Sequence, residues 1–215
     1  MNNPKNSLIQ TFTEQAEAVS ARVVHVSGLD QALDEVVQSC VSKEACTPLA
    51  TGCEQELSLA AADLCSLKDW SRIMAAPGLH SRDLEALTSL CRKESIKLIK
   101  DGLRSQLGGI DVGLTWAEHG IAQTGTVVMN SSQEDIRLAG MISEIHAVLL
   151  PASAIVPDTS SLAQRLEDDF EDAPNYTAFI TGSSRTSDIE RVLTLGVHGP
   201  LQMHIFIIED KNQGG

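Results

Sequence analysis

The chain has 215 residues, and its 42% hydrophobic and 21% charged residues are values typical of a globular protein. This length suffices for one full hydrophobic core, so we interpret residues 1–215 as a single domain. The formal net charge of −13 and the 3% aromatic content disfavour nucleic acid and anionic membrane surfaces as partners.

The N-terminal residues are polar, and no apolar segment resembles a signal peptide or a spanning helix. We therefore expect a cytoplasmic protein without direct membrane insertion. The five cysteines are spaced C-x5-C-x6-C-x11-C-x25-C, which fits neither a zinc pair nor a ferredoxin run. We expect free thiols and no stoichiometric metal or cluster. These cysteines are Cys40, Cys46, Cys53, Cys65 and Cys91.

The N-terminal half alternates between helical and strand patterns. An amphipathic helix is expected within residues 1–20, after a candidate capping box at residues 7–10, and it is a candidate for a peripheral element. His25 alternates with valines and is interpreted as a strand-face residue. The further elements expected here are strands at 22–26, 70–75 and 96–99 and helices at 33–41, 54–64, from Ser81 to Cys91 and at 103–107.

The C-terminal half is richer in strands. Strands are expected at 111–115, 126–129, 147–150, 176–180 and 203–208, and a helix is expected from residue 161 until Pro174. Because strands alternate with helices over most of the chain, the sequence predicts an α/β layered fold. Its sheet should be largely parallel, with helices on both faces.

A polar loop follows the strand at 176–180. Gly182, Ser183 and Ser184 are small, and residues 187–190 fit a capping box, so we expect a helix to begin there and to end near Gly196. Backbone N–H groups, hydroxyls and a helix N-terminus then converge on one spot that favours an anion. Arg185 adds a planar cation suited to carboxylate or phosphate.

Two blocks of sequence carry a resemblance to a known family. Thr-Gly-Ser-Ser-Arg-Thr-Ser-Asp-Ile-Glu at 181–190, followed by Gly-Val-His-Gly-Pro at 196–200, resembles the signature of the lactate-utilisation protein C family (LutC/YkgG, LUD domain). Members usually read S-G-P-S-R-T-A-D-I-E and then G-V-H-G-P. The second block, Gly-Ile-Ala-Gln-Thr-Gly-Thr at 120–126, resembles the family's A-I-A-E-T-G-T. The resemblance covers roughly residue 111 to the end.

The resemblance implies a fold similar to the ribose-phosphate isomerase and CoA-transferase-like group. It also implies a role in converting L-lactate to pyruvate together with iron–sulfur partner proteins. We therefore interpret the chain as an accessory or substrate-binding subunit. Two alternatives stay open: a stand-alone isomerase or transferase acting on a small phosphorylated or carboxylated metabolite, and a sensor of such a metabolite. No P-loop or dinucleotide fingerprint is present, so the sequence gives no support for a bound nucleotide cofactor.

These observations give one candidate pocket for a small carboxylate or phosphate, expected at the carboxyl ends of parallel strands. His198 lies between two glycines and is the candidate catalytic residue, although it could also only brace the turn. His119 is a weaker candidate, and His146 is interpreted as structural. Gln123 stands where the family has Glu, and Ser183 where it has Pro. The candidate residues are Gln123, Thr124, Gly125, Thr126, Gly182, Ser183, Ser184, Arg185, Thr186, Asp188, His198 and Gly199.

Overall fold

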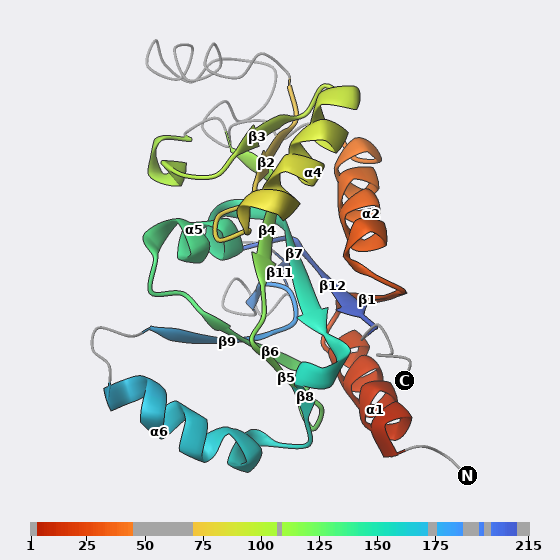
Figure 1. Ribbon diagram of the computed structural model, residues 1–215, viewed down its shortest axis with the longest axis vertical. Helices are drawn as coiled ribbons and strands as arrows, with labels where there is room; N and C mark the ends of the chain where they lie inside the picture. The colour runs from red at the N-terminus through yellow and green to blue at the C-terminus, as the bar shows by residue number, and fades with distance from the viewer. Residues whose placement is uncertain are drawn as a thin grey trace.

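Two β-sheets organise the chain in the computed structural model, which describes residues 4–44, 71–106, 109–171, 176–186, 194–195 and 199–209 (Figure 1). The larger sheet is parallel throughout. Its strands, in spatial order, are β1 (Ala21–Val26), β12 (Gln202–Ile208), β7 (Ser143–Pro151), β4 (Ile110–Trp116), β2 (Ile73–Ala75) and β3 (Lys97–Ile99). The smaller sheet is mixed, and its strands are β8 (Ile155–Val156), β5 (His119–Ile121), β6 (Thr126–Asn130) and β9 (Thr177–Thr181).

One face of the larger sheet is covered by α2 (Leu29–Val41) and α4 (Ser81–Lys93) (Figure 1). Both helices lie in connections that run toward the β3 edge, so right-handed crossovers place them on the same face. Their apolar residues pack on inward-facing residues of the central strands. The contacting set includes Leu33, Val36, Leu87, Cys91, Val112, Leu114, Leu149 and Phe206.

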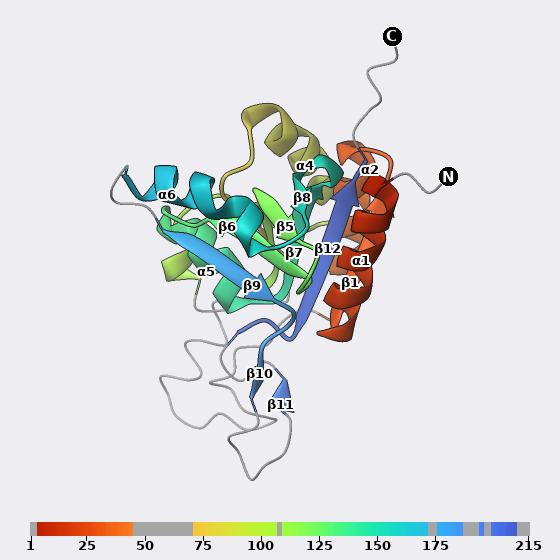
Figure 2. The same cartoon turned by 90° about the horizontal axis from the view of Figure 1, so that it is seen from below.

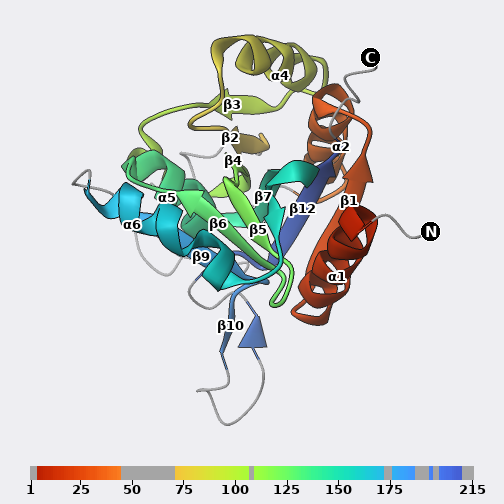
Figure 3. The ribbon, with the colours of Figure 1, turned by 60° about the horizontal axis from the view of Figure 1, so that its bottom comes forward.

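The opposite face is covered by α1 (Pro4–Ala18) and by the smaller sheet. Over β4 and β2 this face is covered by α5 (Glu134–Ile142) and the 3-10 turn η2 (Leu103–Ser105). Figures 2 and 3 show α1 lying alongside β1 and β12. The outer side of the smaller sheet is covered by α6 (Ala163–Glu171), which follows the 3-10 turn η4 (Thr159–Leu162). Connections from β4 to β7 and from β7 to β12 run back along the sheet and therefore cover this second face.

The central position of β7 in the sheet explains why residues 147–150 are a continuous apolar run. Ala147 and Leu149 face α2 and α4, whereas Val148 and Leu150 face α1 and the smaller sheet. A parallel strand with both faces buried needs apolar residues at every position rather than at alternate ones. The predicted layered α/β fold, with a parallel sheet and helices on both faces, is confirmed.

A buried ion pair ties the end of α2 to the amino ends of the central strands. Asp111 is fully buried, and its carboxylate accepts hydrogen bonds from Lys43 Nζ at 2.7 Å and from the Ile73 backbone nitrogen at 2.7 Å. Lys43 Nζ also lies 2.9 Å from a Glu144 carboxylate oxygen. Removing one partner of such a pair typically costs about 3–5 kcal/mol, so this network holds α2 against β4 and β2.

The structure differs from the expected elements in several places, and the helix α5 was not expected at all. The first helix begins at Pro4, and the Ser7 carbonyl already accepts a hydrogen bond from Thr11 Oγ1 within it, so the proposed capping box at 7–10 was wrong. Phe12 and Ala16 of this helix are fully buried, so α1 is part of the core rather than an edge element. The smaller sheet was not foreseen, and the helix expected at 54–64 lies outside the described residues.

Candidate functional site

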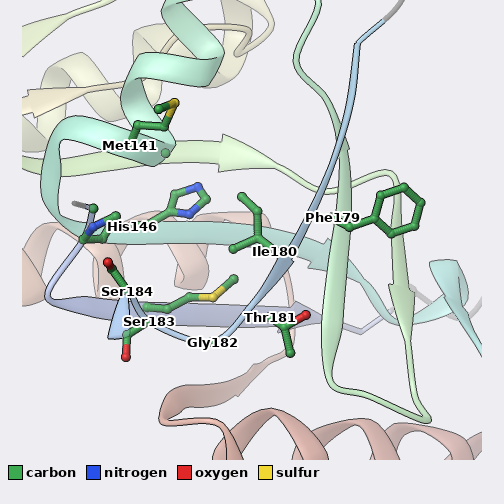
Figure 4. A pocket seen from close by; sticks show the side chains of 12 residues that line it. Met141, His146, Phe179, Ile180, Thr181, Gly182, Ser183 and Ser184 are labelled. Carbon is green, nitrogen blue, oxygen red and sulfur yellow. The ribbon is translucent and has the colours of Figure 1, made fainter. Parts of the chain in front are cut away.

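A pocket of about 320 Å³ lies where the two sheets meet (Figure 4). It is bounded by the amino ends of β7 and β12, the end of α5 and the carboxyl end of β9. Its volume lies at the lower end of the roughly 300–1,000 Å³ typical of small-molecule sites. The lining residues are Gly140, Met141, His146, Phe179, Ile180, Thr181, Gly182, Ser183, Ser184, Gly199, Pro200 and Met203.

Two larger hollows, of about 600 Å³ and 500 Å³, lie at the carboxyl ends of β1 and β12. Neither contains a residue of the two sequence blocks. The pocket at the seam of the two sheets contains Gly182, Ser183, Ser184, Gly199 and Pro200 from those blocks, and it also contains a buried histidine. We therefore take the seam pocket as the candidate site.

Among the described residues that line this pocket, His146 is the titratable one, and it is only 1% exposed. Its Nε2 lies 2.8 Å from Thr115 Oγ1 on the neighbouring strand β4. The ring packs on Gly140, where a Cβ atom would lie 3.2 Å from His146 Cε1. Burial lowers the pKa of His146 from its ordinary 6.5 to about 4, so the ring is neutral at pH 7. The sequence interpretation treated His146 as structural and missed its place in the pocket.

The two segments of the C-terminal block are packed together at the pocket. The Ser184 backbone nitrogen donates a hydrogen bond to the Pro200 carbonyl at 3.1 Å. A Cβ atom on Gly199 would lie 3.1 Å from Ser184 Cβ, so the absence of a side chain permits this close approach. The structure thus brings Gly182, Ser183, Ser184 and Gly199 together, as the sequence analysis expected.

The position of the pocket in the fold differs from the expectation. The bend at residues 182–184 follows β9, which belongs to the smaller sheet. The bend therefore lies over the amino ends of β7 and β12. The prediction of a site at the carboxyl ends of the parallel strands assumed that this strand belonged to the parallel sheet, and for this pocket it was wrong.

The segment after Ser184 also differs in its backbone. Arg185–Thr186 forms a short strand, β10, paired antiparallel with β11 (Thr194–Leu195). Because 194–195 is extended, a helix from Ser187 cannot continue to Gly196, so that helix end was predicted wrongly. The helix start at Ser187 and the candidate residues Asp188 and His198 lie outside the described residues.

The turn at 123–126 packs on the end of α1 rather than lining the pocket. Gln123 and Thr124 are exposed, and Gly125 has φ 63°. A Cβ atom on Gly125 would lie 2.2 Å from the Ala16 backbone nitrogen. The turn still adjoins the pocket through β9, because Thr126 Oγ1 lies 2.7 Å from both Thr124 Oγ1 and Thr181 Oγ1.

The described cysteines and the other described residues offer no metal centre. Cys40 and Cys91 are buried free thiols, and burial raises their pKa to about 12 and about 11. Within the described segments, no group of three or more His, Cys, Asp or Glu side chains is placed to hold a metal ion. Cys46, Cys53 and Cys65 lie outside those segments.

The sequence model of the LUD domain matches residues 9–208. The chain belongs to the LUD domain family. This match confirms the resemblance carried by the two sequence blocks, and it extends over the N-terminal half as well.

Curated LUD relatives align with roughly half of the chain. Lactate utilization protein C of Anoxybacillus flavithermus is 33% identical over 101 residues, covering 47% of this chain and 45% of that protein. Lactate utilization protein C of Halalkalibacterium halodurans is 29% identical over 136 residues, covering 60% and 59%. The uncharacterized protein YkgG of Escherichia coli is 36% identical over 109 residues, covering 49% and 47%. The chain thus spans about half the length of the curated relatives it matches.

The LUD fold is also found in a solved structure. The crystal structure of a DUF162 family protein from Deinococcus radiodurans superposes with a TM-score of 0.53 at 14% identity, covering 95% of this chain and 98% of that one. At this identity the match shows a similar fold.

In the part of the present chain that the structure describes, no helix has the length and apolar character needed to span a membrane.

Proposed function

We propose that this chain takes part in the conversion of L-lactate to pyruvate as an accessory or substrate-binding subunit that works with iron–sulfur proteins. The observation that carries the proposal is the seam pocket, since its lining combines the LUD block residues Gly182–Ser184 and Gly199 with the buried His146. The names of the curated relatives support a place in lactate utilisation.

The pocket lining suits a small carboxylate with an apolar end. Met141, Ile180 and Met203 supply apolar surface for a methyl group, and Ser183 and Ser184 lie at the bend that follows β9 (Figure 4). Small-molecule sites combine mostly apolar walls with a few polar groups that set orientation. In this proposal the pocket binds lactate or pyruvate, and electron transfer belongs to the iron–sulfur partners.

The carboxylate end of the site is proposed to involve Arg185 and Thr186, and Asp188 and His198 stay candidates for it from the sequence. Arg185 directly follows the bend that lines the pocket. A guanidinium group pairs with a carboxylate through two parallel hydrogen bonds, which fixes the orientation of the acid as well as binding it. Thr124 contributes only through the hydroxyl chain that runs by way of Thr126 to Thr181, and Gln123 does not line the pocket.

Growth on a single carbon source tests the proposed role. A strain from which this gene is deleted, and which has no second LUD gene, should fail to grow on L-lactate. It should grow normally on pyruvate, because pyruvate lies beyond the proposed step. Growth on L-lactate should return when the wild-type gene is restored. Normal growth of the deletion strain on L-lactate would show that the chain has no part in this conversion.

A further inference from the structure

His146 occupies an unusual position for a histidine of a buried parallel strand. It sits on β7 between β4 and β12, and its register partners there are Gly113 and Met203. A histidine used only for packing would be expected to satisfy both ring nitrogens inside the protein. Among the described residues, only Nε2 has a hydrogen-bond partner, the Thr115 hydroxyl. The ring borders the pocket (Figure 4), so Nδ1 is the ring nitrogen left for a ligand atom.

The surroundings of the ring fix its orientation. Thr115 is 1% exposed and holds Nε2 from β4. On the side of α5, Gly140 leaves room that any larger residue would fill, since its Cβ would approach the ring to 3.2 Å. A side chain held in this way presents the same ring edge to each ligand, which is how binding sites obtain specificity from few polar groups.

The Thr115 hydroxyl can serve either tautomer of the ring. When it donates to Nε2, the proton of the neutral ring is on Nδ1, which then donates to a ligand oxygen. When Nε2 carries the proton and donates to the threonine oxygen, the hydroxyl hydrogen can turn to Met129 Sδ, 3.9 Å away, and Nδ1 becomes an acceptor. One histidine can therefore meet either a carbonyl oxygen or a hydroxyl group.

We propose that His146 Nδ1 binds the oxygen on carbon 2 of a small 2-hydroxy or 2-oxo carboxylate and so distinguishes such acids from simple fatty acids. This inference deepens the proposed function and rests on it for the class of ligand. A neutral ring matches an uncharged oxygen, and burial keeps the ring neutral at pH 7 by lowering its pKa. The donor and acceptor forms match the oxo and hydroxy acids of a lactate–pyruvate pair.

The affinities of three acids of similar size test whether His146 Nδ1 binds the oxygen on carbon 2. L-lactate and pyruvate carry an oxygen on carbon 2, and propionate lacks it. We expect the wild-type protein to bind L-lactate and pyruvate roughly threefold to tenfold more tightly than propionate, which corresponds to one hydrogen bond. In His146→Leu, the affinity for propionate should stay within about twofold of wild type, and the preference should disappear. In Thr115→Val, which keeps the shape but removes the orienting hydroxyl, the preference should shrink.

Wild-type protein gives a second test that needs no variant at this buried position. With 15N-labelled histidines, L-lactate and pyruvate should shift the ring nitrogens of one of the six histidines, and propionate should not. The inference is overturned if none of the three acids binds, if no histidine ring responds selectively, or if a folded His146→Leu keeps the preference. If lactate growth needs the gene but the preference does not depend on His146, only this inference fails. If His146 sets the preference but growth is normal without the gene, only the proposed function fails.

Discussion

Two glycines of the family blocks have a packing role that their sequence context alone does not reveal. Gly125 and Gly182 both have positive φ, at 63° and 72°. A Cβ atom on Gly125 would lie 2.2 Å from the Ala16 nitrogen, and one on Gly182 would lie 2.0 Å from the Val19 carbonyl oxygen. Both turns therefore pack against the end of α1, and this contact places the segment that lines the pocket.

Alanine substitutions test this packing role. Gly125→Ala and Gly182→Ala should each lower the free energy of unfolding by about 2 kcal/mol or more, because each combines a backbone clash with a strained φ. Urea denaturation measures the change. Gly28→Ser is the matched control, since nothing lies within 4 Å of a Cβ there and Ser is favoured at a helix N-cap. If the two alanine variants are as stable as the control, the close approach to α1 does not constrain these turns.

The same residues show what sequence can predict at this scale. The sequence marked Gly125 as a candidate binding residue, but it could not show whether a ligand or the protein backbone approaches this glycine. The approaching group is Ala16, which is more than a hundred positions away. The position of His146 at the pocket was missed because an apolar strand pattern marks burial without showing which buried side chain borders a cavity.

At the scale of elements, α1 is the helix whose role differs most from expectation. Its apolar spacing was correct, and Phe12 and Ala16 are both fully buried against the core beneath the smaller sheet. Phe12 also fills the space beside Gly120, where a Cβ atom would lie 2.9 Å from the phenylalanine ring. The helix therefore supports the sheet that carries the pocket strand β9.

Truncation of Phe12 measures how much α1 contributes. Phe12→Ala should lower the free energy of unfolding by about 3–5 kcal/mol, as expected when a large buried side chain leaves a cavity. Gln15→Ala, at an exposed position of the same helix, should change it by less than about 0.5 kcal/mol. Thermal or chemical unfolding followed by circular dichroism gives both values. Equal stability of the two variants would mean that α1 contributes little to the core.

Elements with strong periodicity were predicted well, and the two shortest strands of the smaller sheet were not. The strands β1, β4 and β12 and the helices α2 and α4 were each anticipated within a few residues. β5 has three residues and β8 has two, which is too few for alternation to be detected. The pairings of β5 with β8 and of β6 with β9 join distant parts of the chain, so the smaller sheet became evident only in three dimensions.

At the scale of the whole molecule, the pocket exists because two sheets of different type meet. The parallel sheet supplies His146 from β7 and Met203 from β12, and the mixed sheet supplies Ile180 from β9. Strand order could not be derived from local patterns, so the sequence predicted the residues of the bend but placed them at the wrong edge of the parallel sheet. The sequence therefore predicted part of the candidate site. Gly182–Ser184 and Gly199 were predicted from the sequence blocks, and His146 was not.

Two buried histidines should make the stability of the whole fold depend on pH. Burial lowers the pKa of His146 and of His204 to about 4, and nearby Arg22 further lowers that of His204. In the unfolded chain both should titrate near their ordinary 6.5. Between these values the unfolded chain binds more protons than the folded one, so acidification favours unfolding. Their contribution is complete above pH 6.5 and is lost as the pH falls toward 4.

The slope of the free energy of unfolding against pH tests this prediction. Each histidine should contribute up to about 1.4 kcal/mol per pH unit between about pH 6.5 and 5, measured as the free energy of unfolding in urea at several pH values. His146→Gln replaces a titrating ring with a side chain that stays neutral, so it should remove about half of the combined slope even if its stability at pH 8 differs from wild type. His25→Gln is the matched control, because His25 is exposed on β1 and its side chain hydrogen-bonds only with Thr13 among the described residues. An unchanged slope in His146→Gln would mean that this ring titrates in the folded protein as it does in the unfolded chain, and that burial does not lower its pKa.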